Sequence, residues 1–196
     1  MNVCAGNIAG PNLILGALVS ITLAGCVTHI APSTQQNPPP TEPLSGFSHF
    51  ELMPTDASAA ARKEDAALAK IDSNLQVSIK RLILPWEKAD PAGRTLKIEP
   101  FVKELKFVSG NQRFWGGAFA GSSAVVMTLR LVDATSNAVI AEPEFYQRAA
   151  AMSGTWTFGA QDNAMLSRIV EVSAQFLQLN YDKAVGGPTG LEDAGK

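Results

Sequence analysis

The sequence is poor in cysteine, histidine and clustered basic charge, and each shortage excludes a class of function. It has two cysteines, Cys4 and Cys26, so no disulfide can form within a mature chain that begins at Cys26. The two histidines, His29 and His49, have no His, Cys or Glu neighbour at ligand spacing, so no metal site is predicted. The formal net charge is -2 and both signs are mixed along the chain, which argues against nucleic-acid binding.

No apolar run is long enough to span a bilayer, and no lysine or arginine precedes Arg62. The first apolar run covers residues 13–24, whereas a transmembrane helix needs about 20 residues and a signal-peptide core about 7–15. The run therefore fits a signal peptide over residues 1–25, and the alternative is a buried N-terminal helix. Because signal peptides normally begin with a basic residue, either the true start differs from Met1 or the leader is neutral.

The apolar run ends in Leu23, Ala24, Gly25 and Cys26, which resemble the lipobox of bacterial lipoproteins. Small residues let the lipoprotein signal peptidase approach the backbone before a cysteine that already carries diacylglycerol. The resemblance implies cleavage after Gly25 and a membrane anchor of acyl chains, palmitate among them, on Cys26. Several chains on one cysteine anchor a protein stably. Val27 stands where an Asp would favour the inner membrane, so we expect an outer-membrane anchor with the domain facing the periplasm, and the inner membrane is the alternative.

The rest of the chain divides into a tether, a domain and a tail. Residues 26–46 are rich in proline and polar residues, which predicts an extended tether that reaches on the order of 60 Å. The alternative is an extended arm packed onto the domain. Residues 47–182 carry the periodic patterns of one folded domain, and residues 183–196 predict a disordered, glycine-rich tail.

Hydropathy patterns predict the element order β-α-β-β-β-α. Strands are expected over residues 47–53, 95–108, 123–133 and 139–150, and helices over residues 57–84 and 162–182. Thr55 and Asp56 are interpreted as N-cap residues of the first helix. A change of parity at Pro100 and Phe101 predicts a bulge, and Asn137 predicts a hairpin turn. Each element has one apolar side to cover. The fold class is therefore α+β, with a mixed, mostly antiparallel sheet and two helices packed on one of its faces.

Glycine and aromatic residues concentrate between the second and third expected strands. The pattern Gly110-Asn111-x-Arg113, the segment 115–121 and the strand segment 129–133 resemble a family of Gram-negative lipoproteins, domain-of-unknown-function family 4410. The resemblance covers residues 95–181. The family usually has glycine where this chain has Asn137, a mild exchange because asparagine also accepts the left-handed conformation. The family resemblance implies an envelope lipoprotein and says little about activity.

The same glycine-rich loop is the candidate interaction site. Arg113 is expected to pair with a carboxylate of the domain or, alternatively, to bind an anionic ligand. Phe114, Trp115 and Phe119 either pack internally or form a contact patch for a partner. A phosphate-binding loop is disfavoured, because residues 116–121 contain no lysine and precede a strand.

No catalytic residue and no cofactor are predicted. The serines lack a Gly-x-Ser-x-Gly setting and a histidine partner. Glu142 and Glu144, about 7 Å apart along one strand face, are interpreted as a solvated edge rather than a catalytic pair. The sequence therefore predicts a non-catalytic periplasmic module, attached to the membrane by lipid, that binds another envelope protein or the cell wall. The alternatives are a small-ligand-binding or hydrolytic lipoprotein, and a structural lipoprotein that oligomerises by strand pairing. The oligomeric state is left open.

Overall fold

The computed structural model describes residues 33–107, 123–149 and 160–191. In chain order the elements are β1 (Gln36–Asn37), the 3-10 turn η1 (Leu44–Gly46), β2 (His49–Leu52), β3 (Asp56–Ala57), η2 (Ala61–Lys63), α1 (Asp65–Ile83), η3 (Leu84–Trp86), β4 (Thr95–Lys106), β5 (Ala124–Asp133), β6 (Val139–Ala141), β7 (Glu144–Arg148), α3 (Ala160–Leu179) and β8 (Gly187–Pro188). None of the helices within these ranges is both long and apolar enough to cross a membrane.

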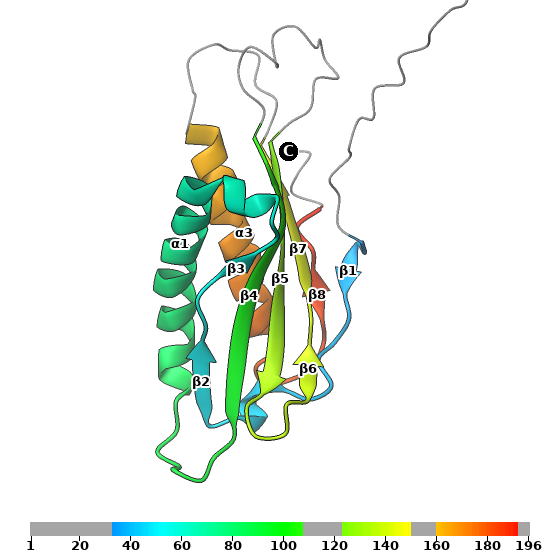
Figure 1. Cartoon of the computed structure of the whole chain (residues 1–196). Coiled ribbons are helices and arrows are strands. Elements are labelled where there is room, and N and C mark those ends of the chain that lie inside the picture. The colour runs from blue at the N-terminus through cyan, green and yellow to red at the C-terminus, as the bar shows by residue number, and fades with distance from the viewer. Residues whose placement is uncertain (1–32, 108–122, 150–159, 192–196) are drawn as a thin grey trace, which may run out of the picture.

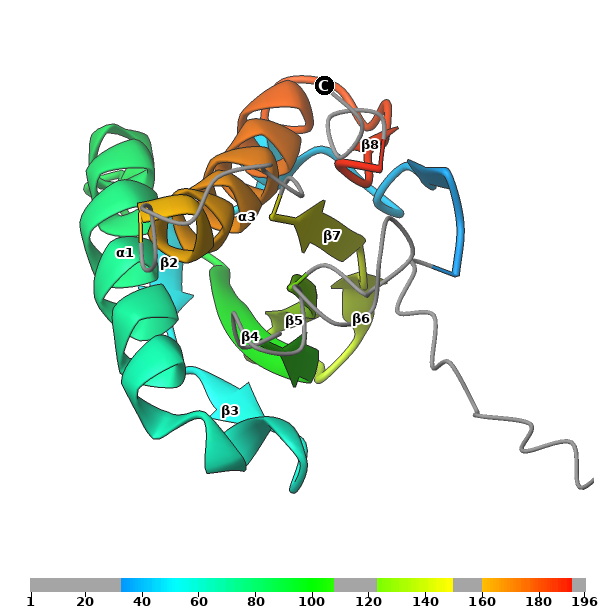
Figure 2. The same ribbon diagram turned by 90° about the horizontal axis from the view of Figure 1, so that it is seen from above.

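Six strands form one mixed sheet with β4 and β5 at its centre. These two strands are antiparallel, from the pair Leu96 and Asp133 to the pair Lys106 and Ala124. Strands β2 and β3 both pair with β4 in parallel, and β6 and β7 both pair with β5 in antiparallel fashion. Helices α1 and α3 pack side by side on one face of the curved sheet (Figures 1 and 2). The predicted α+β class is confirmed.

The alternation of side chains along β4 separates the core from the open face of the sheet. Leu96 and Ile98 are fully buried beneath the helices, whereas Glu99 and Phe101 point to the opposite face and are half-buried. The helices fill the core from the other side with Ile71, Leu75, Ile79, Ile169, Phe176 and Leu177. The apolar sides of α1 and α3 are therefore both used for packing within the domain, as their periodicity predicts.

The first helix begins at Asp65, eight residues later than the sequence predicts. Asp56 and Ala57 instead form β3, which adds a second short parallel strand beside β4. Thr55 does not cap the helix, because its N–H and hydroxyl both donate to Asp72 Oδ1 at 2.9 and 2.8 Å. Pairing with a distant strand has here overridden a local capping signal.

The later strands follow the predicted order with two differences. The bulge in β4 lies between Val102 and Glu104, just beyond the predicted position. The return strand is broken into β6 and β7 around Pro143, which has no N–H to donate to a ladder. The hairpin turn is confirmed, since Asn137 adopts a positive φ of 58°.

The proline-rich segment before the domain is packed onto it over its described part. Strand β1 pairs with β8, and Leu44 is fully buried in the core. The Leu44 N–H donates to Asn180 O at 3.0 Å, and the Thr41 N–H donates to Ile140 O at 2.9 Å. Residues 33–46 thus form a packed arm, which was the alternative to a free tether.

The segment after α3 is also part of the fold, in contrast to the disordered tail predicted from residue 183. The Asn180 side chain accepts the N–H groups of Val185 and Gly186 and so turns the chain at the end of α3. The Tyr146 N–H on β7 then donates to Thr189 O at 2.8 Å. Gly190 (φ 85°) has no room for a side chain, because a Cβ would lie 2.6 Å from the Tyr146 carbonyl oxygen. The folded unit therefore extends at least from residue 33 to residue 191.

Candidate functional site

The residues that the sequence singled out for function are not among those the structure describes. They are Leu23, Ala24, Gly25 and Cys26 at the expected cleavage and lipid-attachment site, and Arg113, Phe114, Trp115 and Phe119 in the candidate interaction loop. The strand ends that border this loop are described. Lys106 pairs with Ala124, so the intervening loop joins adjacent ends of β4 and β5.

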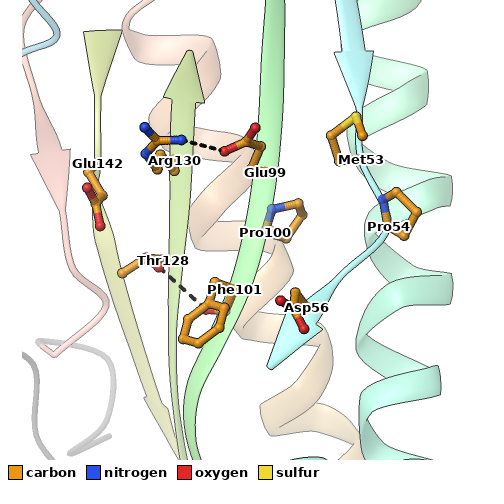
Figure 3. A pocket seen from close by; sticks show the side chains of 9 residues that line it. All are labelled: Met53, Pro54, Asp56, Glu99, Pro100, Phe101, Thr128, Arg130 and Glu142. Atoms are coloured by element: carbon orange, nitrogen blue, oxygen red, sulfur yellow. Dashed lines mark hydrogen bonds and ion pairs between the residues drawn. The ribbon is translucent and has the colours of Figure 1, made fainter. Parts of the chain in front are cut away.

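A hollow of about 400 Å³ opens on the sheet face that the helices leave uncovered. Figure 3 shows how three parts of the sheet line it. Met53, Pro54 and Asp56 come from the interrupted edge formed by β2 and β3, the central strands β4 and β5 provide the floor, and Glu142 stands on the far side after β6. The sequence analysis did not predict this hollow, because its sides are separated by up to 89 positions along the chain.

A row of alternating charges crosses the hollow. Arg130 Nη1 on β5 donates to Glu99 Oε2 on β4 at 2.8 Å. Because Leu131 is opposite Ala141, the next position in register places Glu142 opposite Arg130. Within the described part of the chain, the Glu142 carboxylate has no hydrogen bond or ion pair. One guanidinium therefore stands between two carboxylates and is engaged by only one of them.

The near side of the hollow has a third carboxylate. Asp56 forms an ion pair with Arg62, and both side chains are more than 60% exposed. The hydrogen bond from Arg62, followed by that from the Ala57 N–H, lowers the pKa of Asp56. Solvent screens an ion pair this exposed, so Arg62 can leave Asp56 at little cost.

The apolar part of the floor lies between these charges. The half-buried ring of Phe101 is in register with Asp56 on one side and with Thr128 on the other. Met53 and Pro54 lie where the edge strand leaves β4, between the β2 and β3 pairings. The hollow thus offers an aromatic face and a thioether beside carboxylates.

The packed arm is joined to the sheet two residues beyond Glu142. Glu144 is buried on β7, where Lys103 forms an ion pair with it and the Ser33 N–H donates to it. Burial alone would raise the pKa of Glu144, but the hydrogen bonds from Lys103 and Ser33 outweigh it and leave the pKa lowered. Asn37 donates to Glu144 O and accepts from its N–H, each at 2.8 Å. The hydrogen bonds of Asn37, together with the bond from the Tyr146 N–H to Thr189 O, thus occupy backbone N–H groups along the outer edge of β7.

A second charged cluster, at the other end of β4, is structural. Arg94 donates from both terminal nitrogens to Glu42 at 2.7 Å, donates from Nε to Asp133 Oδ2 at 2.8 Å, and lies 4.3 Å above the Phe47 ring. The Ser136 N–H and then Arg94 lower the pKa of Asp133 to about 2. The cluster ties the arm to the start of β4 and to the hairpin, and all its charges are paired.

His49 serves a similar structural purpose near the same end of the sheet. Its Nδ1 lies 3.0 Å from Glu87 Oε2, and its Nε2 lies 2.7 Å from Asp90 O. The Asp90 carbonyl and then the Glu87 carboxylate raise the pKa of His49. The imidazole thereby holds the loop between α1 and β4 against β2.

No group of three or more His, Cys, Asp or Glu side chains in the ranges above could hold a metal ion. Glu142 and Glu144, close in sequence, differ in environment, since one lines the hollow and the other is bound by Lys103 and the arm. The aromatic face and the carboxylates of the hollow are groups suited to binding a ligand or partner.

No protein-family model and no curated protein sequence matches the chain. Among solved structures, a PelC dodecamer from Paraburkholderia phytofirmans is 14% identical, with 69% of this chain and 91% of that chain covered and a TM-score of 0.38. A Xanthomonas campestris protein of the family model DUF330 is 12% identical (86% and 100% covered, TM-score 0.45). A candidate lipoprotein from Caulobacter crescentus is 18% identical (70% and 90% covered, TM-score 0.35). At these values the role of this chain has to be argued from its own residues.

Proposed function

We propose that this chain is a lipid-anchored protein of the bacterial cell envelope and that its domain binds another envelope component without catalysing a reaction. The anchor is supported by one observation, the lipobox-like residues Leu23 to Cys26 at the end of an apolar run of signal-peptide length. Cys26 carries the acyl chains, and Val27 after it favours the outer membrane with the domain in the periplasm. Membership of family 4410, suggested by the loop residues, belongs to this proposal.

The binding role is supported by the hollow on the open sheet face. Open sheet faces and concave surfaces with a few polar groups are common binding sites. Here the charged groups around Arg94 and His49 are used to hold the fold, whereas Glu142 is unengaged among the described residues. The hollow is therefore the part of the described surface best suited to a partner.

Intact mass tests the anchor directly. The protein purified from its own membrane should have the mass of a chain that begins at Cys26 plus acyl groups, and Cys26→Ala should abolish both processing and membrane association. Cys4→Ala is the matched control and should change neither. An unmodified full-length mass in the wild type would refute the anchor.

Photo-crosslinking tests the binding role separately. A photoreactive amino acid in place of Thr128, on the floor of the hollow, should give a discrete crosslinked product in cells. The same amino acid at Val77, exposed on α1 on the opposite side of the sheet, should give none. Equal crosslinking at both positions would contradict a binding role for the hollow.

Binding of a small molecule is a second candidate function, since a volume of about 400 Å³ lies within the range of known ligand pockets. It predicts a low-mass compound that is retained on the purified wild-type protein. The variant Phe101→Ala should lose that compound, because the ring is part of the apolar floor.

A further inference from the structure

The carboxylates around the hollow outnumber its cations. Among the described residues, Glu99, Asp56 and Glu142 line it together with one base, Arg130. Glu99 already accepts a hydrogen bond from Arg130. An incoming anion would therefore meet a guanidinium that is already engaged, and the carboxylates on either side of it would repel the anion. A cation would instead meet the unengaged carboxylate of Glu142 and the exposed, readily separated pair of Asp56 and Arg62.

The apolar floor suits a particular kind of cation. Lysine and arginine lay their aliphatic stems along apolar surface while their charged ends remain in water. Phe101 provides that surface beside Asp56, with Met53 on the same side of the hollow and Glu142 across β5 from it. An ammonium or guanidinium over the face of Phe101 would gain a cation–π contact. A simple inorganic cation would use only the carboxylates, and within the described chain these do not converge into a metal site.

We propose that the hollow binds a basic, extended segment of a partner protein through two lysine or arginine side chains, one at Glu142 and one at Asp56. This inference rests on the proposed function of the domain as a binding module and specifies its partner. Glu142 follows β6 and Asp56 lies on β3, so β5 and β4 separate them. Three strand spacings amount to about 14 Å, and the offset of two residues between Glu99 and Phe101 along β4 lengthens the separation to about 16 Å, which an extended segment covers in about four to five residues.

The spacing leads to a defined probe. A fluorescent Gly/Ser peptide of eight residues, with lysines at its third and seventh positions, should bind the full-length lipidated protein in nanodiscs of neutral phosphatidylcholine. A peptide with glutamates in place of the lysines should not bind. Free lysine amide should compete only weakly, because it can occupy one of the two positions at a time. Fluorescence anisotropy at low salt measures all three.

Glu142→Gln removes one charge without changing the shape of the side chain. It should lower the affinity for the lysine peptide about threefold, which is the size of the effect expected from one exposed ion pair. Glu142→Gln combined with Asp56→Asn should weaken it about tenfold. Glu171→Gln is the matched control, since Glu171 is exposed on α3 on the other side of the sheet and the substitution changes the net charge equally. It should leave the affinity unchanged.

Three results would overturn the inference. One is no binding of the lysine peptide, and another is equal weakening by Glu142→Gln and Glu171→Gln, which would reflect net charge alone. The third is lysine amide binding as tightly as the peptide, which would make a small amine the occupant. If crosslinking at Thr128 is retained while the peptide fails to bind, the binding role stands and only the basic partner is wrong. If both fail, the proposed function fails as well.

Discussion

Truncation of Leu44 tests whether the proline-rich arm is part of the folded domain. Leu44 is fully buried in the main core, and a buried Leu→Ala substitution costs about 2–5 kcal/mol. The cost depends on how far the surroundings can collapse into the cavity. Here the arm is held on either side of the leucine by the Ser45 N–H bond to Tyr181 O and by the Arg94–Glu42 pair. Because the arm cannot move inward freely, we expect a loss of about 3–4 kcal/mol.

Equilibrium urea unfolding at pH 7 of the chain from residue 27 onward, followed by circular dichroism and tryptophan fluorescence, measures this loss. Leu84→Ala is the matched control, since Leu84 is 72% exposed at the end of α1 and its truncation should change stability by no more than about 0.5 kcal/mol. In a chain of this size, 1 kcal/mol corresponds to about 2–4 °C in Tm, so Leu44→Ala should melt about 6–16 °C below the wild type. Equal costs for the two substitutions would refute the packed arm.

Three further substitutions test other parts of the fold. The pKa of Asp133 is about 2 in the folded protein, below its ordinary value of 3.8, so the stabilisation by this carboxylate is fully present above about pH 4 and is lost as the pH falls through 2. Asp133→Asn should therefore flatten the fall in unfolding free energy between pH 4 and pH 2, and an unchanged slope would contradict that assignment. Asn137→Val should cost about 1–2 kcal/mol, because a β-branched residue is strained at a φ of 58°, whereas Asn137→Gly should be nearly neutral in the same thermal melts. Gly190→Ala should displace the C-terminal segment from β7 and speed hydrogen exchange at the Tyr146 amide, which donates to Thr189, and unchanged protection there would rule out the close approach.

The sequence predicted the elements that depend on local pattern. The apolar stripe of α1, the turn at Asn137 and the strands β4 and β5 each have a periodicity or a backbone preference that is readable within a dozen residues. The arm and the C-terminal segment have no such local pattern. Gln36 pairs with Pro188, and nothing in either short segment identifies a partner so distant in the chain. Within residues 33–46, the sequence offered one signal of packing, the leucine at position 44 among prolines and polar residues.

The hollow was missed for a related reason, although part of it could have been predicted. The hairpin turn that the sequence predicts brings the strand of Arg130 beside the segment of Glu142, but the exact pairing of the two depends on the register shift between Leu131 and Val132. The third carboxylate could not be found in this way. Asp56 was interpreted as a helix cap, and only its parallel pairing with β4 brings it to the hollow. Sequence patterns indicate which face a residue occupies, but the neighbours on that face depend on long-range register.

Packing of the arm also limits how far a lipid-anchored domain can lie from the bilayer. Seven peptide units join Cys26 to Ser33, and at about 3.6 Å each they span no more than about 25 Å, against about 60 Å for a free tether of residues 26–46. Ser33 donates to Glu144, two residues beyond Glu142, so the anchored chain would hold the hollow near the membrane surface. A fluorophore at residue 34 should then be quenched by headgroup-labelled lipid, and a 15-residue Gly/Ser insertion after Val27 should relieve the quenching. Equal quenching with and without the insertion would mean that something other than the arm sets the distance.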